Sequence, residues 1–292
     1  LLNIMLHEVP VFLYDYLKKS LSIFLFGLIK FIKPTSKYVG VEKLKKYFKS
    51  SEIMFVLATG ESINNYSCKD FERISKADSI GINFFILHDF IPTFYLTEPH
   101  SNNFKYFSIL SQNKFSNASI LYKGYSSPTK LSNIVRNVNS VPDNLKNFLV
   151  AKDAYQKGIW SSLPIWMQDN ILKNSHSDFL YNNTGSILYT VFMSFKMGYK
   201  SVILCGFDMS DQYFYCKANS KIYQIAEQCG LCLAKHANKI HNDKDKIENI
   251  ISVLIDMNNK FKIERGGGVF VYTKDGLLSE HLPIFSPSHL SS

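Results

Sequence analysis

The stretch 181–208 constrains the fold of this chain more than any other part of the sequence. A polar turn over 182–186 precedes an almost entirely apolar run over 187–197, and a glycine follows that run, as is typical of a helix end. The run 201–204 is rich in strand-forming residues and leads to Gly-Phe-Asp at 206–208. Ligands bind open α/β sheets at the carboxyl ends of the strands, and helix N-termini bind phosphate. This pattern is therefore typical of a nucleotide-sugar site. The alternative is an ordinary core helix and strand with ordinary caps.

Three further strand ends precede this stretch. Short apolar runs over 53–57, 79–83 and 93–97 predict buried parallel strands, and small or polar residues close each of them. Because the carboxyl ends of parallel strands meet at one edge of a sheet, we expect these residues to lie close together. They are Thr59, Gly60 and Ser62 after the first strand, Asn83 at the end of the second, and Glu98 after the third.

The strands and helices together predict an α/β fold. We expect a Rossmann-like, mostly parallel sheet with helices on both faces. The other expected elements are a strand over 119–123, helices over 223–234 and 247–255, and a last strand over 269–272. Residues 124–180 show little of the regular apolar spacing that marks helices and strands. We therefore expect loops and short helices there, forming a lid or an acceptor-facing insertion.

The N-terminal segment carries a different signal. Residues 11–33 are rich in Phe, Leu and Ile but include four lysines, and the longest charge-free run, 20–29, is shorter than the roughly 20 residues that span a bilayer. An apolar helix with lysines at its rim is suited to the surface of anionic lipid. The alternative is a helix packed on the catalytic domain. We therefore divide the chain into an N-terminal helical segment (1–50), a nucleotide-sugar-binding domain (51–282) and a polar tail (283–292).

Composition limits the function classes. The formal net charge of +9 suits nucleic acid, anionic lipid or phosphate-bearing ligands. The lysines are scattered without a basic stripe or a recognisable nucleic-acid-binding motif, so nucleic acid is the least favoured partner. The five cysteines have no disulfide-framework spacing, which indicates reduced thiols in a cytosolic protein.

The order of these motifs resembles that of the small bacterial sialyltransferases that act on lipooligosaccharide. Their first strand ends in a Gly-Asn-Gly-Pro-Ser loop, similar to Ala-Thr-Gly-Glu-Ser at 58–62, and their second strand carries an Asn similar to Asn83. Their third strand ends in Asn-Pro, where this chain has Glu-Pro at 98–99. Their Thr-Ser-Gly turn, apolar helix, Gly-Tyr-Lys and Gly-Ile-Asp resemble the stretch 184–208. The resemblance covers roughly 53–103 and 182–278.

The resemblance implies a metal-independent glycosyltransferase without a cofactor, whose donor is CMP-sialic acid and whose acceptor is a cell-surface glycan. It implies that His241 is the general base that deprotonates the acceptor hydroxyl, a task suited to an imidazole with a pKa near 6.5. His236 is the rival candidate, and a solvated loop histidine is the simpler interpretation. The residues implied to contact the donor are Thr59, Gly60, Ser62, Asn83, Asn183, Thr184, Gly185 and Ser186, with Tyr213 and Tyr215 at the departing phosphate.

Two departures from the family pattern open an alternative. Glu61 replaces the family's Pro, and Glu98 is an acid where the sialyltransferases have Asn. The retaining Kdo transferases, which use CMP-Kdo, are similar in having a Glu, an Asp and a His in this order. On that interpretation Asp208 is a carboxylate nucleophile and Glu98 the acid/base. Asp208 has a simpler interpretation too, because in many α/β sheets such a residue only ties loops together.

Both interpretations imply the same partners and location. These are a CMP-sugar donor, a glycan or glycolipid acceptor and a membrane surface reached through residues 11–33. The location is the bacterial cytoplasm, peripheral on the inner membrane, and self-association into a homo-oligomer is left open. A hypothesis of another class is a non-catalytic nucleotide- or glycan-binding module at the membrane.

Overall fold

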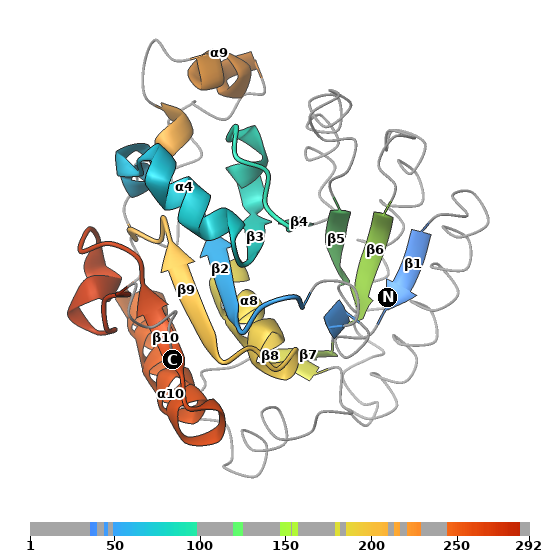
Figure 1. Ribbon diagram of the computed structural model, residues 1–292, viewed down its shortest axis with the longest axis vertical. Helices are drawn as coiled ribbons and strands as arrows, with labels where there is room; N and C mark the ends of the chain where they lie inside the picture. Colours follow the sequence, from blue (N-terminus) through green and yellow to red (C-terminus); the bar gives the residue numbers. More distant parts are fainter. Residues whose placement is uncertain are drawn as a thin grey trace, which may run out of the picture.

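The computed structural model describes residues 36–39, 44–45, 49–97, 119–124, 147–152, 154–156, 179–181, 185–209, 213–216, 221–228 and 244–286. An eight-stranded sheet runs through these residues in the order β1-β6-β5-β4-β3-β2-β9-β10, and every neighbouring pair in it is parallel (Figure 1). Its strands are β1 (Ser36–Val39), β2 (Ile53–Leu57), β3 (Asp78–Ile82), β4 (Phe94–Thr97), β5 (Ser119–Gly124), β6 (Asn147–Lys152), β9 (Ser201–Cys205) and β10 (Gly268–Val271). A separate parallel pair joins β7 (Ala154–Gln156) to β8 (Phe179–Tyr181).

Strand β2 shows how helices cover both faces of the sheet. Met54 and Val56 pack with α8 (Ser186–Lys196) and α10 (Lys244–Arg265), while Phe55 and Leu57 point the other way. The second face is covered by α4 (Cys68–Ser75) and α9 (Lys221–Gln228), and α4 crosses in front of the sheet in Figure 1. Because successive side chains of a strand point to opposite faces, a strand covered on both faces is apolar throughout. All five residues of β2 are buried, as are all five of β9.

Helix α8 is the most deeply buried helix segment in this core. Ser186 through Phe195 are all buried, and Gly198 ends the helix in a left-handed conformation with φ of 80°. The amide of Gly198 donates to the carbonyl of Phe195 and that of Tyr199 to the carbonyl of Ser194. These bonds satisfy helix carbonyls that would otherwise lack partners, so the chain turns directly into β9.

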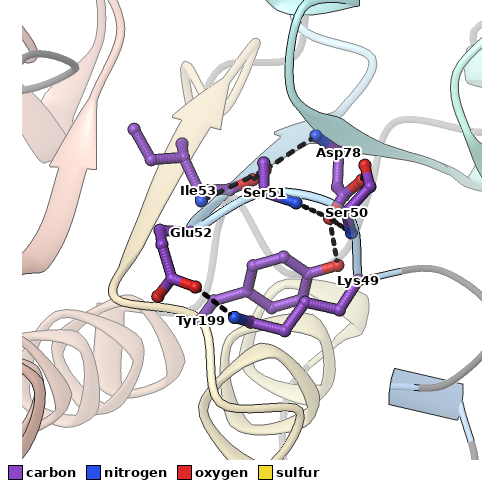
Figure 2. Close-up of polar contacts among 7 residues, drawn as sticks. All are labelled: Lys49, Ser50, Ser51, Glu52, Ile53, Asp78 and Tyr199. Atoms are coloured by element: carbon purple, nitrogen blue, oxygen red, sulfur yellow. Dashed lines mark hydrogen bonds and ion pairs between the residues drawn. The ribbon is translucent and has the colours of Figure 1, made fainter.

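The amino ends of the central strands are held by a buried carboxylate (Figure 2). Asp78, the first residue of β3, is 1% exposed. Its oxygens accept hydrogen bonds from the amide and hydroxyl of Ser50, from the amide of Ser51 and from the hydroxyl of Tyr199. These donors precede β2 and β9, so one side chain fixes β3 against both strands. A buried charge needs this degree of hydrogen bonding.

The structure confirms most expected elements. Strand β2 and helix α8 lie where the sequence predicts them, β3, β4, β5, β9 and β10 differ by one or two residues at their ends, and α10 extends beyond the expected 247–255. Helix α9 begins at Lys221, two residues before the expected 223–234, and residues 229–243 lie outside the described residues. The α/β class with a parallel sheet covered on both faces is therefore correct.

Four strands fall where the sequence predicts other structure. β6, β7 and β8 lie in or at the end of 124–180, for which the sequence predicts loops and short helices, and β6 pairs with β5 in the main sheet. β1 lies within the segment 1–50 that was expected to be helical, and it pairs with β6. β1 carries a lysine and has no continuous apolar run, and β7 and β8 are only three residues long. β6 contains a short apolar run at 148–151, but asparagine and lysine flank it within a polar stretch, so it does not stand out from its surroundings.

The predicted lipid-contacting segment 11–33 lies outside the described residues, and so do most of the insertion and the tail. None of the helices in the described ranges is both long enough and apolar enough to cross a membrane.

Candidate functional site

The candidate site lies where the strand order reverses. From β2 the chain proceeds through β3, β4 and β5 to one side, while β9 and β10 lie on the other side of β2 (Figure 1). Ligands of open parallel sheets bind outside the carboxyl ends of two such neighbouring strands. The loops after β2 and β9 meet there, and the amide of Gly60 donates to the carbonyl of Gly206 at 2.8 Å. The predicted strand-end residues are therefore brought to one edge of the sheet.

Asp208 joins these two loops. Its Oδ2 accepts a hydrogen bond from the amide of Ser62 at 2.7 Å, and its Oδ1 accepts one from the Ser62 hydroxyl. Ser62 is 4% exposed and lies in the short 3-10 helix η1 (Glu61–Asn65). Each oxygen of the carboxylate thus has a donor from the same residue. This is the arrangement expected of a residue that ties two loops together.

Two glycines permit this close approach. A Cβ at Gly60 would lie 2.5 Å from Asp208 Oδ2, and a Cβ at Gly276 would lie 2.7 Å from the Asp208 Cα. Gly60 has an ordinary φ of −64°, so the close contact alone excludes a side chain there, whereas Gly276 also has a φ of 95°. The glycine in the predicted phosphate loop is therefore explained by packing against Asp208.

A second contact joins the end of β3 to the start of α8. The Ser186 hydroxyl donates to Asn83 Oδ1 at 3.2 Å. Asn83 is exposed and has a φ of 52°, an uncommon conformation for a residue other than glycine that asparagine tolerates best. It opens the 3-10 helix η2 (Asn83–Leu87). The bond places an exposed amide side chain directly beside a helix N-terminus.

Among the described residues, nothing caps or covers this N-terminus. Gly185 is the N-cap of α8, has a φ of 122° and makes no side-chain capping hydrogen bond. A Cβ built on Gly185 would meet nothing among the described residues within 4 Å. The first amides of a helix point outward and carry the positive end of the helix dipole. The Asn83 amide and the α8 N-terminus together form a place where an anion can be bound.

The two predicted tyrosines also lie beside the first loop. Tyr213 forms an isolated antiparallel bridge with Gly60, and the amide of Phe214 donates to the carbonyl of Thr59 at 3.0 Å. The rings of Tyr213 and Tyr215 are stacked at 5.2 Å with an angle of 2° between them. They are therefore held in one orientation next to the strand ends, and their predicted contact with the departing phosphate remains a prediction.

Burial controls the ionisable groups beneath the loops. The pKa of Tyr66 is raised far above its ordinary range, first by burial and then by the neighbouring Cys205 and Asp208. Burial also raises the pKa of the Cys205 thiol. Both groups therefore stay protonated and neutral at physiological pH, so Asp208 has no additional anion beside it from either of them.

A cavity of about 460 Å³ adjoins the Asp208–Ser62 contact. Among the described residues its walls are Glu61, Ser62, Asn64, Asn65, Asp208, Asp275 and Gly276. They come from the loops that follow β2, β9 and β10. The sequence analysis does not single out Asn64, Asn65 or Asp275. The only sequence feature that points to these three residues is that each is polar and follows a predicted strand.

Four predicted site residues lie outside the described residues. They are Glu98, Asn183, Thr184 and His241. Their predicted roles remain predictions. The same holds for the donor contacts expected of the described residues Thr59, Gly60, Ser62, Asn83, Gly185, Ser186, Tyr213 and Tyr215.

Comparison with known proteins gives structural similarity without sequence matches. No family model matches the chain, and no curated protein matches its sequence. The chain is similar to the sialyltransferase CstII from Campylobacter jejuni in complex with the substrate analogue CMP-3FNeuAc, with 16% identity, a TM-score of 0.47, and coverage of 84% of this chain and 88% of that chain.

Two further solved structures show the same similarity. CST-II in complex with a trisaccharide acceptor and CMP has 16% identity and a TM-score of 0.48, over 82% of this chain and 88% of that one. The apo form of an alpha-2,3-sialyltransferase from Campylobacter jejuni has 14% identity and a TM-score of 0.44, over 82% of this chain and 81% of that one. All three of these structures are of sialyltransferases.

Proposed function

We propose that this protein is a glycosyltransferase that moves an acidic keto-sugar of the sialic acid type from a CMP-activated donor to a cell-surface glycan. The observation that carries the proposal is the N-terminus of α8 beside Asn83, which no described side chain caps or covers. An anionic phosphate is the ligand that helix amides and the helix dipole favour. The sequence motifs, in the order described above, supply the expectation that this phosphate belongs to CMP.

The geometry of Asp208 bears on the choice between two chemical routes. In a retaining transfer with CMP-Kdo, a carboxylate oxygen would attack the sugar, with Glu98 as acid/base. Both Asp208 oxygens accept hydrogen bonds from Ser62, which lowers their nucleophilicity and supports a positioning role. We therefore favour direct displacement, in which His241 removes the proton from the acceptor hydroxyl while the C–O bond to the CMP phosphate breaks.

CMP binding, measured by isothermal titration calorimetry, is the first test of the anion site. We expect Ser186→Ala and Asn83→Ala each to weaken CMP binding by about tenfold, since a hydrogen bond to a charged group contributes roughly 1.5–3 kcal/mol. Ser194→Ala is the matched control, because Ser194 lies in the same helix and its hydroxyl donates within the helix, to the carbonyl of Thr190. Equal affinity in all four proteins would remove the α8 N-terminus from the donor site.

Donor turnover separates the enzyme from a binding module. Purified protein is incubated with CMP-sialic acid or CMP-Kdo, released CMP is measured, and the protein is examined by mass spectrometry. Consumption of CMP-sialic acid without an adduct supports direct displacement. A sugar-sized adduct that is absent from Asp208→Ala supports the retaining route instead. CMP binding without consumption of either donor, with glycan acceptors present, would leave only the non-catalytic module.

We also propose that residues 11–33 hold the protein on the cytoplasmic face of the bacterial inner membrane. The lysines at the rim of this apolar segment support contact with anionic lipid. Replacing Lys18 and Lys19 by Ala should reduce co-sedimentation with anionic vesicles. A wild-type protein that stays in the supernatant would contradict this placement.

A further inference from the structure

The cavity beside Asp208 has a chemistry different from that of the proposed donor site. Its volume of about 460 Å³ is within the range typical of sites for small molecules. We propose that this cavity is the acceptor subsite and that it takes an uncharged, hydroxyl-rich sugar. The inference rests on the proposed function, because only a glycosyltransferase needs an acceptor sugar beside its donor.

The walls of the cavity are suited to sugar hydroxyls. Glu61 and Asp275 provide carboxylate oxygens, which only accept hydrogen bonds when ionised. Asn64 and Asn65 provide amides, which both donate and accept. A sugar hydroxyl is also both a donor and an acceptor, so it can be satisfied by either kind of group. The Asn65 amide already donates to Asp275 Oδ2 at 3.5 Å, which links the loop after β2 to the loop after β10.

The same walls disfavour an acidic ligand. Three of the described lining residues are Asp or Glu, and none is Lys, Arg or His. A carboxylate or phosphate in this cavity would lie beside like charges in a partly desolvated space. The net charge of +9 for the whole chain suggests the opposite preference, but recognition depends on the charges that line the cavity. The donor phosphate is expected at the α8 N-terminus, where the field has the opposite sign.

A metal ion is a less suitable occupant. Within the described ranges, no group of three or more His, Cys, Asp or Glu side chains is close enough to hold a metal ion. Asp208 already accepts two hydrogen bonds from Ser62, so its oxygens are directed toward η1. The shared wall formed by Ser62 and Asp208 places the cavity at the same strand ends as the donor-site loops, where an acceptor must bind.

The test compares two sugars that differ by one acidic residue. Lactose is neutral, and sialyllactose is the same disaccharide with an added carboxylate-bearing sugar. The affinity of CMP-saturated protein for each is measured by ligand-observed NMR titration. We expect lactose to bind at least about tenfold more tightly than sialyllactose. In Glu61→Lys this ratio should fall below about two, because one anion in the wall becomes a cation.

Glu72→Lys is the control for long-range charge effects. Glu72 lies on α4, pairs with Lys76 and is not among the cavity walls, so this variant should keep the wild-type ratio. Asn65→Ala should weaken lactose binding several-fold and leave the CMP affinity unchanged. These measurements require no turnover, and CMP affinity is recorded for every variant.

The outcomes separate the two proposals. If wild-type protein does not bind CMP, the proposed function fails. If it binds CMP but prefers sialyllactose, binds neither sugar, or shows the same ratio in Glu61→Lys as in wild type, the acceptor inference is wrong and the donor proposal stands. A ratio that changes equally in Glu61→Lys and Glu72→Lys would also overturn it, since general surface charge would then explain the preference.

Discussion

Ser62 donates both its amide and its hydroxyl to the carboxylate of Asp208, across 146 positions of sequence. The two residues follow neighbouring strands at the centre of the sheet, so this contact fixes how the two loops face each other. Asp208 is therefore a structural part of the site whatever chemistry it performs. The first two predictions depend on this geometry.

Removing either partner should destabilise the protein. We expect Asp208→Ala to lower the free energy of unfolding by about 2–3 kcal/mol, since a buried amide and hydroxyl lose their acceptor. Ser62→Ala should lower it by about 1 kcal/mol. Urea denaturation measures both. In the double variant the loss should be smaller than the sum of the single losses by at least about 0.5 kcal/mol. Strict additivity would show that the contact contributes nothing in solution.

Gly60→Ala tests the close approach of Asp208. The new methyl group would lie 2.5 Å from Asp208 Oδ2 and 2.6 Å from the carbonyl oxygen of Gly206, so one of the two loops must move. We expect a loss of about 2–4 kcal/mol in thermal or urea unfolding, within the range of overpacked sites.

Gly185→Ala provides the comparison. Nothing among the described residues within 4 Å opposes a methyl group there, so its loss of about 1 kcal/mol should come from the φ of 122° alone. If Gly60→Ala were tolerated as well as Gly185→Ala, the packing of Asp208 against Gly60 would be wrong.

The buried carboxylate at the amino ends of the strands gives a third prediction. Burial, followed by the charge of Asp78, raises the pKa of Tyr199, so its hydroxyl remains a donor across the accessible pH range. Tyr199→Phe should lower the free energy of unfolding by about 2 kcal/mol, and Asp78→Ala by more than about 3 kcal/mol. Tyr223→Phe is the matched control, since its hydroxyl lies 3.5 Å from Glu227 on an exposed face, and its effect should stay within about 0.5 kcal/mol.

Stability should fall at acid pH partly through Asp70. Burial alone would raise the pKa of this carboxyl, but hydrogen bonds from Ser67 and Tyr272 and the charge of Arg73 lower it below its ordinary value. A folded pKa below the unfolded one adds stability above the unfolded value, and this stability is lost as the pH falls through the folded value. Wild type should therefore lose this contribution below about pH 4.

Urea denaturation at several pH values between about 6 and 3 checks this sign. The stability difference between wild type and Asp70→Asn should shrink as the pH falls. Tyr272→Phe removes one donor to Asp70 and should show a smaller version of the same trend. A difference that is constant or grows toward acid pH would contradict the lowered pKa.

The sequence predicts the centre of this fold better than its edge. β2 and β9 are covered on both faces, so their apolar runs identify them directly. β1 carries Lys37 and lacks that pattern, whereas β6 contains only a short apolar run, 148–151, inside a polar stretch. Helix α4, which is not among the predicted elements, carries a sequence signal of its own, since Ser67 and Asp70 form a reciprocal capping box at its start.

The candidate site is predictable to a similar extent. That Ser62, Asn83, Ser186 and Asp208 share one edge follows from parallel strands alone. Their pairing does not, because it depends on β9 lying next to β2 while β3 lies on its other side. The meeting of Asn65 with Asp275 has the same origin, as these residues are 210 positions apart.

The central strand pair also has a consequence for how the chain acquires its structure. β2 is complete at residue 57, but its partner β9 begins only at residue 201. A contact across so long a loop has a large closure entropy, and folding slows as such distant contacts dominate. During synthesis on the ribosome, the edge of β2 that pairs with β9 therefore stays without its partner strand until most of the chain has been made. The Asp208–Ser62 contact can form only after β9 and the loop that follows it have been made. A nascent chain should therefore gain CMP affinity only after β9 has emerged.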